Sequence, residues 1–275
     1  MVTLDDLKKN KNEILKNISN NEKGRDEIIS LCSPVLDKRA YFTIDNFGKV
    51  KRKNYNYNLA ATVFVDDNND FLNFISEIID FKEITKIEKI GRLTNAKDEE
   101  LHKNIYKLLA KGELNYLLKP LKEIYMRSEN KFFEILFNFT MMDNIFSKKT
   151  LCVYSLKKYF QKYGYSDEAL FLCVSYLAKQ RADFYEFENE KNLNNSTSKE
   201  ELKEIIKNNL EQLRNEAGLT LLSYFIVLLQ FNYENEKNYI TILKNNLTKL
   251  LVSNNEYRKL NNIENEIFTG LSREV

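Results

Sequence analysis

Several residue types are scarce in this 275-residue sequence, and each shortage excludes a class of protein. Seven glycines and two prolines are too few for a collagen, a Gly/Ser linker or a β-sandwich with many tight turns. The glycines are never close neighbours, so the sequence lacks a GxGxxG loop, a Walker A loop and a GxSxG nucleophile turn. Nucleotide binding by a glycine-rich loop is therefore not expected.

Histidine and cysteine are scarce as well. His102 is the single histidine, which rules out an HExxH motif or a two-histidine metal site, and we expect it to be an exposed surface residue. Cys32, Cys152 and Cys173 are widely spaced and contain no CxxC pair. They are expected to be reduced thiols packed in the interior rather than a disulfide framework or a zinc site. No cofactor is predicted.

Charge and hydrophobic runs bear on partners and location. Forty-two basic residues against 40 acidic ones leave a net charge of +2, so no overall field favours a polyanionic partner. The longest apolar stretch, 219–231, is shorter than the roughly 20 residues that span a bilayer, and we interpret it as a buried central helix. The first residues show no secretory signal. These features predict a cytoplasmic protein with no membrane contact.

Apolar residues recur at helical spacing from about residue 95 to the end of the chain. Gly112 and Gly164 are expected to end helices, and Ser166 to begin one. The sequence therefore predicts an antiparallel multi-helix domain over 92–275, with a linker at 191–198 where polar residues predominate.

The first 91 residues have a different pattern. Two short helices are expected before Pro34, followed by a β-hairpin whose strands lie at 41–44 and 49–58. Residues 60–65 are predicted to form a buried third strand and 84–90 a fourth, with a helix capped by Asp70 between them. The predicted fold class is α+β: a predominantly α-helical chain with a small antiparallel β region at about residues 39–90, inside an N-terminal domain of residues 1–91.

The second strand of that hairpin is the first candidate site. It carries four cations and two tyrosines: Lys49, Lys51, Arg52, Lys53, Tyr55 and Tyr57. Cations neutralise phosphates and tyrosine rings stack on unpaired bases, a combination typical of surfaces that bind single-stranded nucleic acid. The alternative is a solvated edge strand whose lysines prevent edge-to-edge pairing.

Two further groups of residues each have a functional interpretation and a purely structural one. Asp66, Asp67 and Asp70 offer hard oxygen ligands that suit Mg²⁺ or Ca²⁺, or else they form a polar turn and helix cap. A set of aromatic residues predicts either a groove for a partner helix or part of the core; it comprises Tyr159, Tyr163, Tyr165, Tyr176, Phe184, Tyr185 and Phe187. The pair Lys148–Lys149 is expected on a solvated helix face.

Three functions follow from these observations. The preferred one is a non-catalytic helical interaction protein, an adaptor or inhibitor that binds another protein. The second is binding of single-stranded nucleic acid by the hairpin 49–57, in a defence or mobile-element system. The third is a metal-dependent carboxylate enzyme built on the aspartates, although the sequence identifies no catalytic residue.

Overall fold

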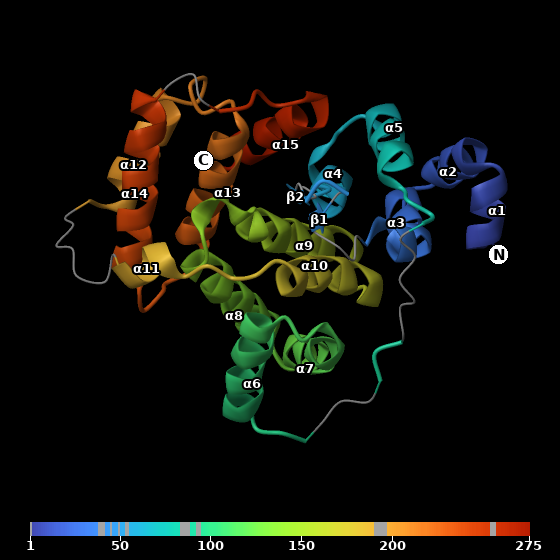
Figure 1. The fold of residues 1–275 in the computed structure, drawn as a ribbon, viewed down its shortest axis with the longest axis horizontal. Helices are drawn as coiled ribbons and strands as arrows, with labels where there is room; N and C mark the ends of the chain where they lie inside the picture. The colour runs from blue at the N-terminus through green and yellow to red at the C-terminus, as the bar shows by residue number, and fades with distance from the viewer. Residues whose placement is uncertain are drawn as a thin grey trace. The chain divides into compact units, whose positions relative to one another are not determined.

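The computed structural model describes residues 2–37, 42–44, 46–48, 50–52, 55–82, 89–91, 95–189, 197–253 and 257–275. These residues form fifteen α-helices, a short 3-10 helix and one pair of strands (Figure 1). The elements up to residue 127 are α1 (Leu4–Lys9), α2 (Lys11–Ser19), α3 (Gly24–Leu36), β1 (Phe42–Ile44), β2 (Val50–Arg52), α4 (Asn58–Phe64), α5 (Asn68–Ile78), α6 (Asp98–Lys111) and α7 (Leu114–Arg127). The remaining elements are α8 (Glu129–Met142), η1 (Ile145–Ser147), α9 (Lys149–Tyr163), α10 (Asp167–Lys179), α11 (Tyr185–Asn189), α12 (Lys199–Asn208), α13 (Glu216–Gln230), α14 (Glu236–Val252) and α15 (Asn262–Ser272).

The chain divides into two compact units, and each is made from two separate stretches of sequence. Unit 1 combines Met1–Phe132 with Ser155–Arg181, and unit 2 combines Phe133–Tyr154 with Ala182–Val275. Two of the three boundaries fall inside α8 and α9, and the third lies between α10 and α11. The division predicted from the sequence, 1–91 and 92–275, has other bounds than these units and stays a prediction.

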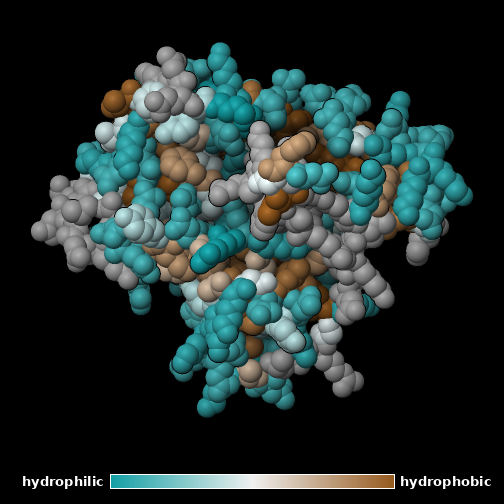
Figure 2. All heavy atoms as spheres, viewed as in Figure 1, coloured by the Kyte–Doolittle hydropathy of each residue, from teal (hydrophilic) through white to brown (hydrophobic). Residues whose placement is uncertain are grey.

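Helix α10 is the centre of unit 1. Every residue from Ala169 to Ala178 is buried, because α3, α4, α6 and α7 all pack against this helix. A helix that is apolar on all sides is stable only when neighbours surround it. The outer helices are amphipathic instead, and Figure 2 shows hydrophilic side chains over most of the visible surface of α1, α2 and α6.

A buried arginine joins α3 to the two helices that follow the hairpin. The Arg25 guanidinium donates hydrogen bonds to the backbone carbonyl oxygens of Thr62, Val65 and Asp66, at the end of α4. It also donates to Asn68 Oδ1 at 2.7 and 2.9 Å, and it lies 4.7 Å from the centre of the Phe71 ring. The last carbonyls of a helix have no partner within the helix, so this contact satisfies them and fixes the start of α3.

The predominantly helical character predicted from the sequence is confirmed, but the predicted α+β fold class, with an antiparallel β region at about residues 39–90, is wrong. Residues 60–65, predicted to be a central strand, belong to α4 up to Phe64. A short apolar run fits a buried strand or a buried helix equally well, and here the alanines Ala60 and Ala61 favour helix. The hairpin contributes three residues per strand, with Thr43 paired to Lys51, which is too little to form a sheet layer. Most of the predicted strand 84–90 lies outside the described residues.

Unit 2 is built around α13. Residues 217–228 are buried without interruption, and α14, α15 and η1 pack against them. The apolar run interpreted as a buried helix is therefore confirmed for most of its length. Asn215 caps α13 by accepting a hydrogen bond from the Gly218 backbone at 2.9 Å. Of the predicted linker 191–198, the structure describes only Thr197, which is buried, and Ser198, which caps α12.

No helix among the described residues is both long and apolar enough to cross a membrane.

Candidate functional site

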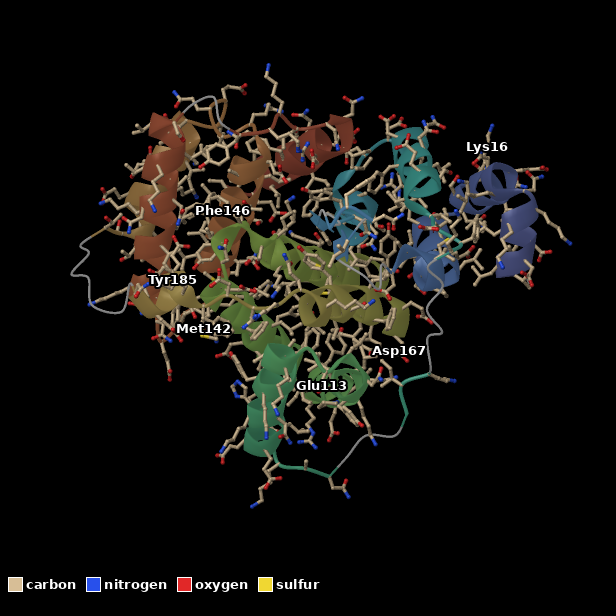
Figure 3. All side chains as sticks on the ribbon, viewed as in Figure 1. Lys16, Glu113, Met142, Phe146, Asp167 and Tyr185 are labelled. Carbon is tan, nitrogen blue, oxygen red and sulfur yellow. The ribbon has the colours of Figure 1, made fainter. Side chains whose placement is uncertain are left out.

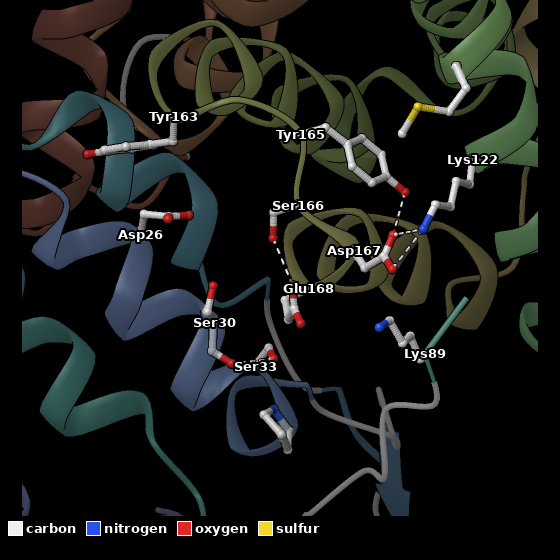
Figure 4. Close-up of a pocket in the computed structure, with 12 residues that line it drawn as sticks. Asp26, Ser30, Ser33, Lys89, Lys122, Tyr163, Tyr165, Ser166, Asp167 and Glu168 are labelled. Carbon is white, nitrogen blue, oxygen red and sulfur yellow. Dashed lines mark hydrogen bonds and ion pairs between the residues drawn. The ribbon is translucent and has the colours of Figure 1, made fainter. Parts of the chain in front are cut away.

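A polar cleft of about 700 Å³ lies within unit 1. Its walls come from α3, from α7, from the connection between α9 and α10 with the first turn of α10, and from Lys89 (Figure 4). The lining residues are Asp26, Ser30, Ser33, Pro34, Lys89, Lys122, Met126, Tyr163, Tyr165, Ser166, Asp167 and Glu168.

The wall formed by the start of α10 is determined by residues close together in the sequence. Gly164 has a φ of +88°, a left-handed conformation that favours glycine, and it ends α9. Ser166 then caps α10 by accepting a hydrogen bond from the Ala169 backbone at 3.1 Å. The tight turn brings Tyr163, Tyr165 and the first two acids of α10 into the lining of the cleft. Figure 3 shows Asp167 at this end of the helix.

Lysine and tyrosine together neutralise and orient Asp167. The Lys122 ammonium of α7 lies 3.0 Å from the Asp167 carboxylate, and the Tyr165 hydroxyl donates to Asp167 Oδ1 at 2.7 Å. The same ammonium lies 5.6 Å from the centre of the Tyr165 ring. Burial and the hydrogen bond to Asp167 raise the pKa of Tyr165 well above its ordinary value, so the phenol remains a donor.

A buried phenol holds the carboxylate on the opposite wall. The Tyr159 hydroxyl donates a hydrogen bond to Asp26 in the first turn of α3. The Tyr159 side chain is fully buried, and burial followed by the hydrogen bond to Asp26 raises its pKa far above the ordinary value. The phenol therefore orients Asp26 without cancelling its charge.

Glu168 is held in the same manner. The Ser166 hydroxyl donates to Glu168 Oε2 at 3.1 Å, and no described cation pairs with Glu168 within 4.0 Å. The cleft thus contains three carboxylates and two lysine ammonium groups, and one of those ammonium groups is already paired with Asp167. Its described residues therefore carry an excess of negative charge.

A second, smaller cleft adjoins the first. It has a volume of about 430 Å³ and shares Lys89 with the polar cleft. Its lining combines apolar residues with polar ones: Ile90, Leu114, Leu118 and Phe171, together with Lys89, Asn115 and Lys119.

The structure separates the residues of the predicted nucleic-acid surface. Lys49 and Lys53 lie outside the described residues, and Lys51 and Arg52 form the end of β2. Tyr55 and Tyr57 follow the hairpin and are each only 6% exposed, with the Tyr55 ring 4.6 Å from that of Tyr176. These two tyrosines pack in unit 1 and offer no face to a base. The role of the four cations stays a prediction.

The aspartate cluster forms a helix cap. Asp67 accepts hydrogen bonds from the backbones of Asn69 and Asp70, at 2.7 and 3.0 Å, and so caps α5. The predicted cap was Asp70, which lies three residues too late. Asp66, Asp67 and Asp70 are exposed, and nowhere in the described ranges do three His, Cys, Asp or Glu side chains gather closely enough to hold a metal ion.

The remaining candidates are placed as follows. His102 is exposed on α6, and Cys32, Cys152 and Cys173 are buried free thiols, as the sequence predicts. Of the aromatic set, Tyr159, Tyr176 and Phe187 are buried, whereas Tyr163 and Tyr165 line the cleft. Sequence reasoning found Tyr163, Tyr165 and the Ser166 cap, but it gave no role to Asp26, Lys122 or Glu168. Nothing in the sequence shows that residues 26, 122 and 168 share one cleft.

No protein-family model, no curated protein and no solved structure matches this chain.

Proposed function

We propose that this chain is a cytoplasmic, non-catalytic binding protein whose polar cleft holds a segment of a partner protein. One observation carries the proposal: hydroxyl groups, not cations, orient two of the cleft's carboxylates. Asp26 receives its hydrogen bond from Tyr159, and Glu168 receives one from Ser166. Acceptors that are oriented in advance, with their charge available, lose little entropy when a ligand binds.

The hydroxyl groups of the cleft favour binding over covalent catalysis. A nucleophilic serine needs a base positioned to take its proton. Ser33 instead donates its hydroxyl to the backbone carbonyl oxygen of Ser30 at 3.3 Å, within its own helix. The Ser166 hydroxyl donates to Glu168, but its oxygen also accepts the capping hydrogen bond from the Ala169 backbone. Tyr159 and Tyr165 keep their protons at ordinary pH because their pKa values are raised. These groups supply fixed donors and acceptors, which is what recognition requires.

The size of the cleft limits what it can hold. A volume of about 700 Å³ accommodates a few side chains or a drug-sized molecule, and is too small for a docked helix of several turns. A short, extended segment of a partner is therefore the ligand that we propose.

A peptide-display selection tests this function. The full chain is immobilised and a random dodecapeptide library on phage is selected against it, in parallel with the variant Asp26→Asn/Glu168→Gln. Both substitutions keep an oxygen that accepts the hydroxyl hydrogen bond, so the walls of the cleft are retained while two charges are removed.

The expected result is a set of peptides enriched on the unmodified chain and lost on the cleft variant. The matched control is Glu27→Gln/Glu99→Gln, which removes two charges from exposed positions outside the cleft lining and should retain the same peptides. Selection that yields no peptides, or peptides retained equally by the cleft variant, would contradict the proposal.

A further inference from the structure

We infer that the two adjoining clefts recognise one extended segment, which carries a basic side chain and, three or four residues away, an apolar one. This inference rests on the proposed function and specifies its partner. The polar cleft takes the basic side chain, arginine in preference to lysine, and the smaller cleft takes the apolar one.

The charge of the polar cleft selects a cation. Hydroxyl donors, not cations, hold Asp26 and Glu168, and Lys122 is occupied by Asp167. With Lys89 as the second ammonium of the lining, three carboxylates still outnumber two cations, so an anionic ligand would approach an excess of negative charge in a partly enclosed site. A cationic side chain there replaces solvent with charge-assisted hydrogen bonds, which are stronger than neutral ones.

The spacing of the carboxylates selects an organic cation over a metal ion. Asp26 belongs to α3 and Glu168 to α10, on different walls (Figure 4). Among the residues that the structure describes, no three His, Cys, Asp or Glu side chains could hold a metal ion together, and this includes the carboxylates of the cleft. A guanidinium carries five N–H donors on a planar, extended frame, so it can bridge acceptors that lie apart.

Helix α7 fixes the distance between the two clefts. It lines the smaller cleft with Leu114 and Leu118, and the polar cleft with Lys122 and Met126. The midpoints of these pairs are eight residues apart on α7, which corresponds to about 12 Å along a helix. An extended chain covers that distance in about three to four residues.

The smaller cleft suits an unbranched or γ-branched apolar side chain. Leu114, Leu118 and Phe171 supply carbon atoms, and its volume of about 430 Å³ holds one leucine or methionine side chain with room for its backbone. Lys89 lines both clefts, so a segment passing from one to the other crosses it.

Defined peptides test the inference by fluorescence anisotropy. The probe is a fluorescein-labelled decapeptide of glycine and serine that carries one arginine and, four positions later, one leucine. We expect replacement of either residue by serine to weaken binding to the full chain about tenfold, and replacement of arginine by glutamate to abolish it. The protein variant Asp26→Asn/Glu168→Gln should bind the probe as weakly as the unmodified chain binds the peptide without arginine. Replacing the leucine of the probe by serine should weaken binding to this variant further.

A competition experiment distinguishes recognition of a peptide segment from binding of a small free cation. Arginine amide and spermidine are each added to the complex of the full chain with the probe. The inference predicts that they compete only at concentrations far above the Kd of the probe, because they lack the apolar residue. Displacement at concentrations comparable to that Kd would overturn it in favour of a small cationic ligand.

The two proposals fail differently. If the library selection yields peptides that depend on the cleft but lack a basic residue, the binding function stands and the inference fails. If no peptide depends on the cleft, both fail.

Discussion

At the scale of single residues, the geometry of the cleft depends on two groups, Arg25 and Tyr159, that are not part of its lining. Arg25 holds the start of α3 against the end of α4, and the next residue, Asp26, projects from that fixed turn into the cleft. Tyr159, fully buried, then sets the direction of the Asp26 carboxylate. A positioned carboxylate is therefore the product of a buried arginine and a buried phenol, each from a different part of the sequence.

A charge network in unit 2 gives a prediction of pH dependence. Glu216, at the start of α13, contacts Lys148 and lies 3.0 Å from Arg258. Burial acts to raise the pKa of Glu216, but the two cations outweigh it and the pKa is lowered from 4.5. A carboxyl with a lowered folded-state pKa stabilises the fold above pH 4.5 and loses that contribution as the pH falls through the lowered value.

We therefore expect Glu216→Gln to cost roughly 1 kcal/mol at pH 7, and to cost progressively less below pH 4.5. The measurement is the urea midpoint of the full chain at several pH values between neutral and acid. Glu234→Gln, at an exposed position in the same unit, is the control and should show no such trend. A cost for Glu216→Gln that stays constant across this pH range would show that the ion pairs are not its cause.

Lys149 and Tyr55 are two residues that the sequence predicted to be exposed and that the structure shows to be buried. The pair Lys148–Lys149 was expected on a solvated face, but Lys149 is fully buried and paired with Asp143, and burial lowers its pKa. Tyr55 was assigned to an exposed strand and is buried against Tyr176. In both cases the partner is another side chain of the same unit, and charge or aromaticity at one position does not reveal that partner.

At the scale of elements, periodicity predicted the helices well where capping residues marked their ends. Gly112 and Gly164 end α6 and α9, and Ser166 begins α10, as predicted. The helix α4 was mistaken for a strand because a fully buried segment has no polar face, and so no period to distinguish the two. The start of α10 is capped by Ser166, whereas the start of α3 has no side-chain cap, so the sequence revealed the α10 wall of the polar cleft and not the α3 wall.

Gly112 provides a test of how closely two elements approach. Its φ is +71°, and a Cβ atom there would lie 2.5 Å from the backbone carbonyl oxygen of Ala178, at the end of α10. Gly164 has a φ of +88° but open space around it. Both substitutions to alanine incur left-handed strain of about 1 kcal/mol, and only Gly112→Ala adds a collision with backbone.

We expect Gly164→Ala to lower the free energy of unfolding by about 1 kcal/mol and Gly112→Ala by about 2 to 4 kcal/mol. Urea denaturation of the two variants alongside the unmodified chain measures both values. Equal losses would mean that α10 does not pack as closely on the end of α6 as the structure shows.

At the scale of the whole molecule, the chain forms its two units from interleaved stretches. Residues 155–181 join 1–132, although the intervening residues 133–154 belong to unit 2. A hydrophobic stripe on a helix shows that the helix packs, but it carries no information about which helix it packs against. This limit explains why Asp26 and Glu168, 142 positions apart in the sequence, were not recognised as parts of one site.

The most direct test of the binding site is an amide NMR titration of the uniformly ¹⁵N-labelled full chain with the arginine–leucine decapeptide. The proposed site predicts that the largest chemical-shift changes fall on residues of three segments, 26–33, 114–126 and 163–171, and that Asp26→Asn/Glu168→Gln removes those at 26–33 and 163–168. Largest changes elsewhere, at the hairpin or in unit 2, or changes at 26–33 and 163–168 that persist in the variant, would contradict it.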